Sequence, residues 1–476
     1  MNQSDYLAHD AVGLAGLIAS RQVSAEEVLE AAIARTEALN PALNAVTLSL
    51  ADEARARLHE IPPEGPLAGV PFLIKDLGAP VRGTPTTAGS RLFAQARAPA
   101  DSALVAAYRR SGLVIFGKTN TPEFGLEPVT EPEMFGPTLN PWNVARTPGG
   151  SSGGAASAVA AGLVAAAHAS DGGGSIRIPA SCCGLFGLKP SRGRVSFAPA
   201  DEGWGGFSAQ HAVTRTVRDS AALLEIACRP APGDPYWLDP PASPFATEVG
   251  REPGSLRIGF TTAALCAEAL DPICAQAVRD AASLCASLGH HVEEATLPGN
   301  PERLAAVTGA IVAASVAAAL EGEAAQRGRA IEEGEIEAFT WSLYQRGRAV
   351  SGAAYIQALR TAHAFGREVA PFFERFDVLL LATLGSPPIA SGALRGEPPD
   401  PRGYAERLFA FMPNTQAFNV TGQPAMSVPL AWTADGLPVG VQFVGRPAAE
   451  ATLFRLAAQL EAAQPWAGRR PPAPFG

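Results

Sequence analysis

Residues 149–175 read GGSSGGAASAVAAGLVAAAHASDGGGS. Each of the two glycine-rich clusters adjoins a serine, and between them lie an Ala-rich stretch predicted as a helix and an apolar segment predicted as a strand. A helix of about 10 residues rises about 15 Å, and a return strand of about six residues covers about 20 Å. The chain therefore leaves one glycine-rich loop and comes back beside it, so Ser175 is predicted to lie close to Ser151.

The same alternation of helix and strand extends outward from this segment. A capping box at Ser24–Glu27 begins a helix that Asn40–Pro41 is expected to end. Further strands are predicted at 70–76, 113–116, 256–260 and 377–381, and further helices at 102–111 and 271–289. Such alternation predicts an α/β fold in which helices cover a sheet.

One domain over residues 1–476 is favoured over two. A Pro-rich stretch, Pro230–Pro253, could be a linker, but the strands predicted on its two sides can equally belong to one sheet. Residues 301–370 are Ala-rich and helical in pattern, with no strand signal. They are interpreted as a helical region of the same domain.

Composition excludes several classes of protein. The chain has 476 residues, is 47% hydrophobic and 17% charged, and carries a net charge of −9, so it is neither disordered nor attracted to nucleic acid. The first residues lack the pattern of a signal peptide, and Leu304–Leu320 is expected to be a buried helix. The six cysteines show no metal-binding spacing and are expected to be reduced core thiols. A cytoplasmic protein without metal or cofactor is expected.

One match to a nucleotide-binding pattern is misleading. Gly112–Thr119 fits G-x4-G-K-[ST], but its four variable positions are Leu-Val-Ile-Phe. In a phosphate-binding loop the strand precedes the first glycine. Here the strand would occupy the loop itself, so nucleotide binding is not expected.

The glycine clusters instead favour nucleophilic catalysis by serine. Consecutive glycine N–H groups can converge on one oxygen, as an oxyanion hole requires. A serine nucleophile also needs a base. His168 lies in an apolar strand and is interpreted as a packed histidine. Lys75 follows the apolar segment Val70–Ile74, where desolvation would lower its pKa, although a solvated or ion-paired lysine stays an alternative.

Several separated motifs together resemble the amidase signature family. They keep the family's order and spacing over nearly the whole chain, and they explain the false nucleotide-binding match. The matching segments are Gly69–Asp76, Gly117–Asn120, Gly149–Gly154, Asp171–Pro179, Gly184–Pro190, Asn419–Ala425 and Gly436–Gln442. The resemblance implies a single domain with a mixed central sheet sandwiched by helices.

The resemblance also implies a Ser–cis-Ser–Lys triad. Ser175 would be the nucleophile, Ser151 would follow a cis peptide from Gly150 and relay the proton, and Lys75 would be the neutral base. The N–H groups of Gly172, Gly173 and Gly174 would stabilise the oxyanion of an acyl-enzyme reaction.

Three further residues are given supporting roles by the same resemblance. Ser152 is expected to hydrogen-bond Lys75 or the loop, and Asp171 and Arg177 to hold loops. Many family members carry a larger residue at the position of Gly172, so the oxyanion loop is expected to be more open here.

The substrate is expected to be a bulky or apolar amide. The sequence looks most like the subgroup that includes 6-aminohexanoate cyclic-dimer hydrolases, near bacterial enzymes that cleave aryl amides and urethanes, so carbamate or ester cleavage stays open. Pocket walls are expected from 126–136, 198–207, 301–345 and 408–412. The apolar candidates that they offer are Met134, Phe135, Trp204, Trp341, Tyr344 and Phe411.

Two alternatives to a stand-alone amide hydrolase were weighed. A glutaminase subunit of a tRNA-dependent amidotransferase would need partner subunits and a pocket for the α-carboxylate and amine of glutamine. A non-catalytic binding protein is disfavoured because all three triad positions are occupied. The expected partners are a small amide or carbamate substrate and water, with no nucleic acid and no membrane. A homodimer is left open.

Overall fold

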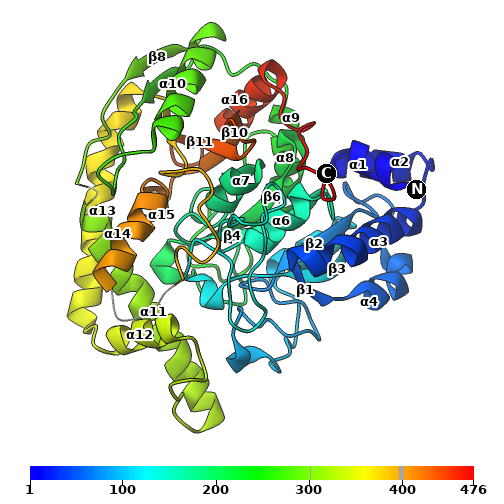
Figure 1. Cartoon of the computed structure of the whole chain (residues 1–476), viewed down its shortest axis with the longest axis horizontal. Coiled ribbons are helices and arrows are strands. Elements are labelled where there is room, and N and C mark those ends of the chain that lie inside the picture. The colour runs from blue at the N-terminus through cyan, green and yellow to red at the C-terminus, as the bar shows by residue number, and fades with distance from the viewer. Residues whose placement is uncertain (301, 396–400) are drawn as a thin grey trace.

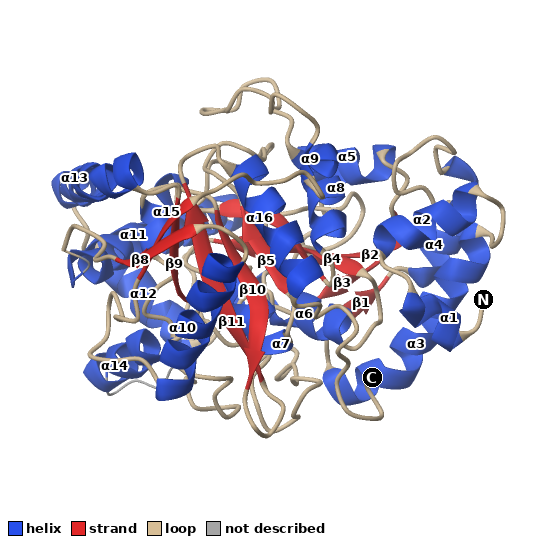
Figure 2. Ribbon diagram, turned by 90° about the horizontal axis from the view of Figure 1, so that it is seen from above, coloured by secondary structure: helices blue, strands red, loops and turns tan. Residues whose placement is uncertain are grey.

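One mixed sheet runs through the whole molecule. The computed structural model describes residues 1–300, 302–395 and 401–476, and its 11 strands lie in the order β1-β3-β2-β4-β6-β5-β10-β11-β9-β7-β8. Helices cover both faces of this sheet (Figures 1 and 2). The α/β fold with a mixed central sheet between helices is therefore confirmed.

The strands are mostly short, and β10 and β11 are the longest of them. Their bounds are β1 (Val46–Ser49), β2 (Pro71–Lys75), β3 (Val114–Thr119), β4 (Ala166–Asp171), β5 (Phe186–Lys189), β6 (Ala209–Thr214), β7 (Arg257–Phe260), β8 (His291–Glu294), β9 (Val378–Ala382), β10 (Ala425–Trp432) and β11 (Pro438–Gly445).

The helices range from single turns to more than 20 residues. Their bounds are α1 (Gln3–Ala8), α2 (Ala11–Ala19), α3 (Ala25–Leu43), α4 (Ala51–Ala56), α5 (Ala103–Arg110), α6 (Gly153–Ala160), α7 (Arg177–Cys183), α8 (Val217–Ala227), α9 (Phe245–Glu248), α10 (Pro272–Ser287), α11 (Glu302–Arg327), α12 (Ala338–Arg348), α13 (Gly352–Arg375), α14 (Pro401–Phe411), α15 (Ala417–Val420) and α16 (Glu450–Ala463).

The strand β2 lies between β3 and β4 and is parallel to both. All five of its residues are buried. Strands in this position are covered on both faces, so they consist of continuous apolar residues rather than alternating ones. The buried run therefore ends at Lys75, deep in the molecule.

The Pro-rich stretch 230–253 does not separate two sheets. The strands β7, β8 and β9 follow it and form a second parallel group. This group joins the rest of the sheet through the antiparallel pairing of β9 with β11. The same sheet therefore contains strands from both sides of the stretch.

Two helices differ in detail from the expectations. The helix α3 begins at the predicted Ser24 capping box but continues past Pro41 to Leu43, where Asn44 adopts a left-handed conformation. The helix α11 is long and apolar enough to cross a membrane. It packs against α12 and α13, as the core helix of a water-soluble protein also does. Residue 301, where the helical region was expected to start, lies outside the described residues.

The false nucleotide-binding stretch contains the fully buried strand β3. Its lysine, Lys118, forms an ion pair with Asp76 at 3.2 Å. The Lys118 ammonium therefore already has an anionic partner inside the protein.

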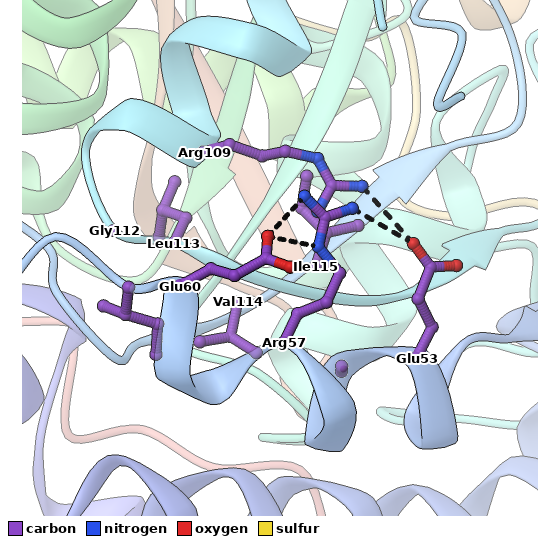
Figure 3. Close-up of a pocket in the computed structure, with 10 residues that line it drawn as sticks. Glu53, Arg57, Glu60, Arg109, Gly112, Leu113, Val114 and Ile115 are labelled. Carbon is purple, nitrogen blue, oxygen red and sulfur yellow. Dashed lines mark hydrogen bonds and ion pairs between the residues drawn. The ribbon is translucent and has the colours of Figure 1, made fainter. Parts of the chain in front are cut away.

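A small pocket at the opposite end of β3 from Lys75 is filled by ion pairs (Figure 3). Arg57 pairs with Glu60 at 2.9 Å and with Glu53 at 3.3 Å. Arg109 pairs with Asp101 at 3.0 Å. The charged side chains of this pocket are therefore engaged in ion pairs within the protein.

Candidate active site

Lys75 is the residue expected to be the base of the candidate site. Its side chain is fully buried at the end of β2. Its Nζ lies 2.7 Å from Ser151 Oγ and 3.0 Å from Ser170 Oγ. Burial lowers the pKa of Lys75 to about 7, against an opposing effect of Asp171. A substantial fraction of this lysine is therefore the neutral amine near pH 7.

A histidine lies directly beneath this lysine. His168 Nδ1 accepts a hydrogen bond from the Lys75 backbone N–H at 3.3 Å, and its Nε2 lies 3.0 Å from Gln210 Oε1. Burial lowers the pKa of His168 to about 3, so the ring is neutral, with its proton on Nε2 facing Gln210. It is a packed histidine that supports the backbone of Lys75.

The serine loop approaches the start of the nucleophile helix. The peptide bond between Gly150 and Ser151 is cis. A Cβ added to Gly149 would lie 2.9 Å from the Cα of Pro179 in α7, so this loop packs on the helix that Ser175 precedes. The Ser175 side chain is 9% exposed. The structure thus bonds Lys75 to Ser151 and places the Ser175 segment beside their loop.

The glycine loop 172–174 is held from beneath. Gly174 has a φ of +140°, and a Cβ there would lie 2.5 Å from Thr415 Oγ1. Thr415 Oγ1 donates to the Gly173 carbonyl at 2.6 Å. With this carbonyl occupied, the peptide groups of the loop are fixed in one orientation.

Asp171 and Arg177 anchor the two ends of that loop. They form two hydrogen bonds of 2.9 Å each, and both side chains are fully buried. Arg177 also donates to Gln442 Oε1 at 2.7 Å and to Asn419 Oδ1 at 2.6 Å. Burial alone would raise the pKa of Asp171, but Arg177, Lys189 and Asn419 together lower it to about 2. Their contacts are those of loop-holding residues.

Ser152 bonds the neighbouring strand and not Lys75. Its Oγ donates to the Ser170 carbonyl at 3.2 Å and accepts from the Ser170 N–H at 3.3 Å. Among the described residues, the Ser152 side chain therefore bonds the main chain of β4, not Lys75 or the loop, the two partners that were expected.

Ser170 is the site residue that the sequence reasoning missed. A signal was present, because alternate residues of a strand face the same side. His168 and Ser170 are the polar members of the otherwise apolar run before Asp171, and both contact Lys75. Thr415 was also missed, since no pattern links it to the glycine loop.

A cavity of about 290 Å³ adjoins the catalytic loops. Three helices each contribute one face at helical spacing, and three single residues complete the wall. These are Ala305, Thr308, Gly309 and Val312 of α11; Phe339, Ser342, Leu343 and Arg346 of α12; Tyr404, Ala405, Leu408 and Phe409 of α14; and Leu126, Trp204 and Gln416.

The cavity reaches the reacting groups from two sides. Leu126 follows Gly125, where a Cβ would lie 3.1 Å from Ser151 Oγ. Gln416 Cγ lies 3.4 Å from a Cβ added to Gly173. A molecule in this cavity would therefore border both Ser151 and the glycine loop 172–174.

Trp204 overturns the expectation of a more open oxyanion loop. A Cβ on Gly172 would lie 2.6 Å from two carbons of the Trp204 ring. Trp204 has a φ of +47° and is flanked by glycines with positive φ. Because the indole occupies the space that a larger residue at 172 would take, the loop is covered.

Trp204 is the one member of the expected pocket set that lines this cavity. Met134 and Phe135 lie in a loop that Asn44 binds through the Phe135 carbonyl. Trp341 and Tyr344 pack against each other at 5.4 Å, on the face of α12 next to the one that lines the cavity. Phe411 is buried in the main core. The expected segments supply lining residues, but mostly different ones.

Comparison with known proteins gives consistent matches over the full length. The Amidase family model matches residues 27–454. A 6-aminohexanoate-cyclic-dimer hydrolase of Paenarthrobacter ureafaciens is 39% identical, covering 98% of this chain and 97% of that protein.

Solved structures agree with these sequence matches. A structure of 6-aminohexanoate cyclic dimer hydrolase has a TM-score of 0.92 at 38% identity, covering 98% of this chain and 99% of that one. A bacterial aryl acylamidase has a TM-score of 0.88 at 30% identity, covering 97% and 99%.

Proposed function

Because the chain belongs to the amidase signature family of amide hydrolases, we propose that Ser175, Ser151 and Lys75 form its Ser–cis-Ser–Lys triad. The observation that carries this proposal is the 2.7 Å contact between Lys75 Nζ and Ser151 Oγ. A buried amine with a pKa of about 7 can accept a proton at neutral pH.

The first half of the reaction forms an acyl-enzyme. Neutral Lys75 accepts the Ser151 proton on its lone pair while one N–H stays bonded to Ser170. Ser151 in turn takes the proton of Ser175, whose oxygen attacks the amide carbonyl. The N–H groups of Gly172–Gly174 stabilise the resulting oxyanion. Ser151 then protonates the leaving nitrogen, since an amide anion is a poor leaving group, and takes a proton back from the Lys75 ammonium, which becomes neutral again.

The second half repeats the relay with water. Water gives a proton through Ser151 to Lys75 and attacks the ester carbonyl of acylated Ser175. Collapse of that tetrahedral intermediate breaks its bond to the Ser175 oxygen and releases the carboxylic acid. The Ser175 oxygen takes a proton from Ser151, which is reprotonated by Lys75, so all three residues return to their starting state. No step uses a metal or a cofactor.

The substrates that we propose are bulky or apolar amides. The cavity is lined by Val312, Phe339, Leu343, Leu408 and other apolar side chains, which favour apolar groups on either side of the scissile bond. Aminohexanoate oligomers, aryl amides and urethanes fit this class. We further propose that the enzyme is cytoplasmic and needs neither nucleic acid nor a membrane.

A glutaminase subunit is the alternative function. Glutamine carries both an α-carboxylate and an ammonium group, so its pocket should offer both charges. Within the part of the chain that the structure describes, the cavity lining contains one arginine and no carboxylate side chain. This distribution favours the stand-alone hydrolase.

A substrate panel on the purified protein alone tests the function. It contains anilides, linear and cyclic aminohexanoate oligomers, glutamine and small carbamates. We expect turnover of anilides or aminohexanoate amides that is lost in Ser175→Ala. Turnover of glutamine alone would contradict the proposal.

A further inference from the structure

One positively charged side chain lies in the wall of the proposed substrate cavity. Of the described side chains that line it, Arg346 alone carries a charge. Two other polar side chains of the lining already have partners: Thr308 donates to the Leu304 carbonyl at 2.7 Å, and Tyr404 bonds Glu127. Neither bond involves Arg346.

Close packing of two helices fixes the place of Arg346. A Cβ on Gly347 would lie 1.9 Å from the Ala313 carbonyl oxygen, so α12 approaches α11 as near as its backbone allows. Next to it, Arg346 Nη2 lies 3.6 Å from a Cβ added to Gly309. The guanidinium therefore lies across α11 at a position without a side chain.

Arg348, two residues after Arg346 on the same helix, differs from it in having partners. Arg348 forms an ion pair with Glu321 at 3.3 Å, and its guanidinium lies over the Tyr344 ring. The Arg346 side chain has no hydrogen bond or ion pair to any residue within 1–300, 302–395 and 401–476. Its guanidinium carries five N–H donors, and none of them is paired with one of these residues.

Arg346 is connected to the reaction centre along one wall. Thr308, one residue before Gly309, has its Oγ1 3.4 Å from Gln416 Oε1. Gln416 in turn contacts the position of Gly173 in the oxyanion loop. An apolar stretch containing Val312, Phe339 and Leu408 lines the same space.

From this placement we propose that Arg346 binds a carboxylate at the far end of the substrate, separated from the scissile amide by an apolar spacer. The inference rests on the proposed amide hydrolysis and names its substrate class: amides with a distant carboxylate. Guanidinium is suited to this ligand because two of its N–H groups match the two carboxylate oxygens. The apolar spacer would contact the walls between the two ends.

Two pairs of substrates test the proposal. The first compares the mono-p-nitroanilide of a dicarboxylic acid with the p-nitroanilide of the monocarboxylic acid of equal length. The second compares an N-acyl ω-amino acid with the N-acyl alkylamine of equal length. Together they place the carboxylate on the acyl side or on the amine side of the bond.

The quantity measured is the ratio of kcat/KM between the charged and uncharged members of each pair. We expect this ratio to fall about tenfold in Arg346→Gln for at least one pair, mainly through KM, and to be largely kept in Arg346→Lys. Added salt should reduce the ratio in the unmodified enzyme. Arg348→Gln, on the same helix but outside the cavity lining, is the matched control and should leave it unchanged.

An equal ratio in the unmodified enzyme and Arg346→Gln for both pairs would overturn the carboxylate site. Turnover of the uncharged anilide, and its loss in Ser175→Ala, reports separately on the proposed hydrolysis. Circular dichroism checks that each variant is folded. Failure of the carboxylate site and failure of the hydrolase function therefore give different results.

Discussion

The catalytic loops and the cavity wall are built in opposite ways. Lys75, Ser151 and Asp171 lie on or beside adjoining strands of the sheet, are buried and are bonded to neighbours on several sides. The cavity wall consists of single faces of α11, α12 and α14, which are half exposed and distant from those strands in sequence. The residues proposed for the chemistry are therefore held by the core, whereas the proposed substrate cavity is walled by helices outside those strands.

This difference predicts where a substitution abolishes all activity and where it alters selectivity. The largest effect is expected from the triad itself. Ser175→Ala and Lys75→Ala should each lower kcat by a factor of roughly 10³ or more on every substrate, because nucleophile and base are removed. Full kinetics on one anilide, with circular dichroism as the folding check, measures this. Full activity of Lys75→Ala near neutral pH would show that the relay is wrong.

The second effect concerns the buried ion pair. Asp171→Asn leaves the Arg177 guanidinium buried without its carboxylate, which should lower the free energy of unfolding by about 3–5 kcal/mol. Urea unfolding followed by fluorescence measures the loss. Arg218→Gln, at a half-exposed pair with Asp10, serves as the control and should cost much less. If Asp171→Asn were as stable as the unmodified protein, the ion pair between Asp171 and Arg177 would not be what holds the loop.

The third effect is on pH dependence. Lys75 must be neutral to act, and burial places its pKa at about 7, so kcat/KM should rise as pH increases through about 7. Ser170→Ala removes an acceptor that favours the charged amine, so the midpoint should move to lower pH. Ser152→Ala, which loses bonds to the main chain only, should leave the midpoint in place. A pH–rate profile unaffected by Ser170→Ala would show that Ser170 does not influence the pKa of Lys75.

The smallest effect tests the contact between the two regions. Gly172→Ala would place a Cβ against the Trp204 ring, so we expect a several-fold rise in KM for bulky amides. Trp204→Ala should relieve that clash in the double variant, giving a non-additive cycle. Additive effects of the two substitutions would indicate that the indole does not cover the loop in solution.

The sequence predicted the two regions unequally, for a physical reason. The helix and strand between Ser151 and Ser175, and the apolar run before Lys75, are local patterns, and the structure contains them. Ser170 could have been found from strand alternation with His168. Thr415 and the Trp204 contact with Gly172 could not, because tertiary packing alone brings those residues together. The pocket candidates Trp341 and Tyr344 lie on a helix that lines the cavity, but on a face that does not line it. Hydrophobicity alone does not show which apolar face of a helix meets a cavity.

The central claim, that Lys75 activates Ser175 through Ser151, can be tested most directly with a fluorophosphonate that reacts with activated serines. Intact-protein and peptide mass spectrometry would locate the adduct, and its rate of formation would be followed against pH. The account predicts one adduct on Ser175, forming faster as pH rises through about 7 and far more slowly in Lys75→Ala and Ser151→Ala. An adduct on another residue, or labelling of Ser175 at an unchanged rate in Lys75→Ala, would contradict it.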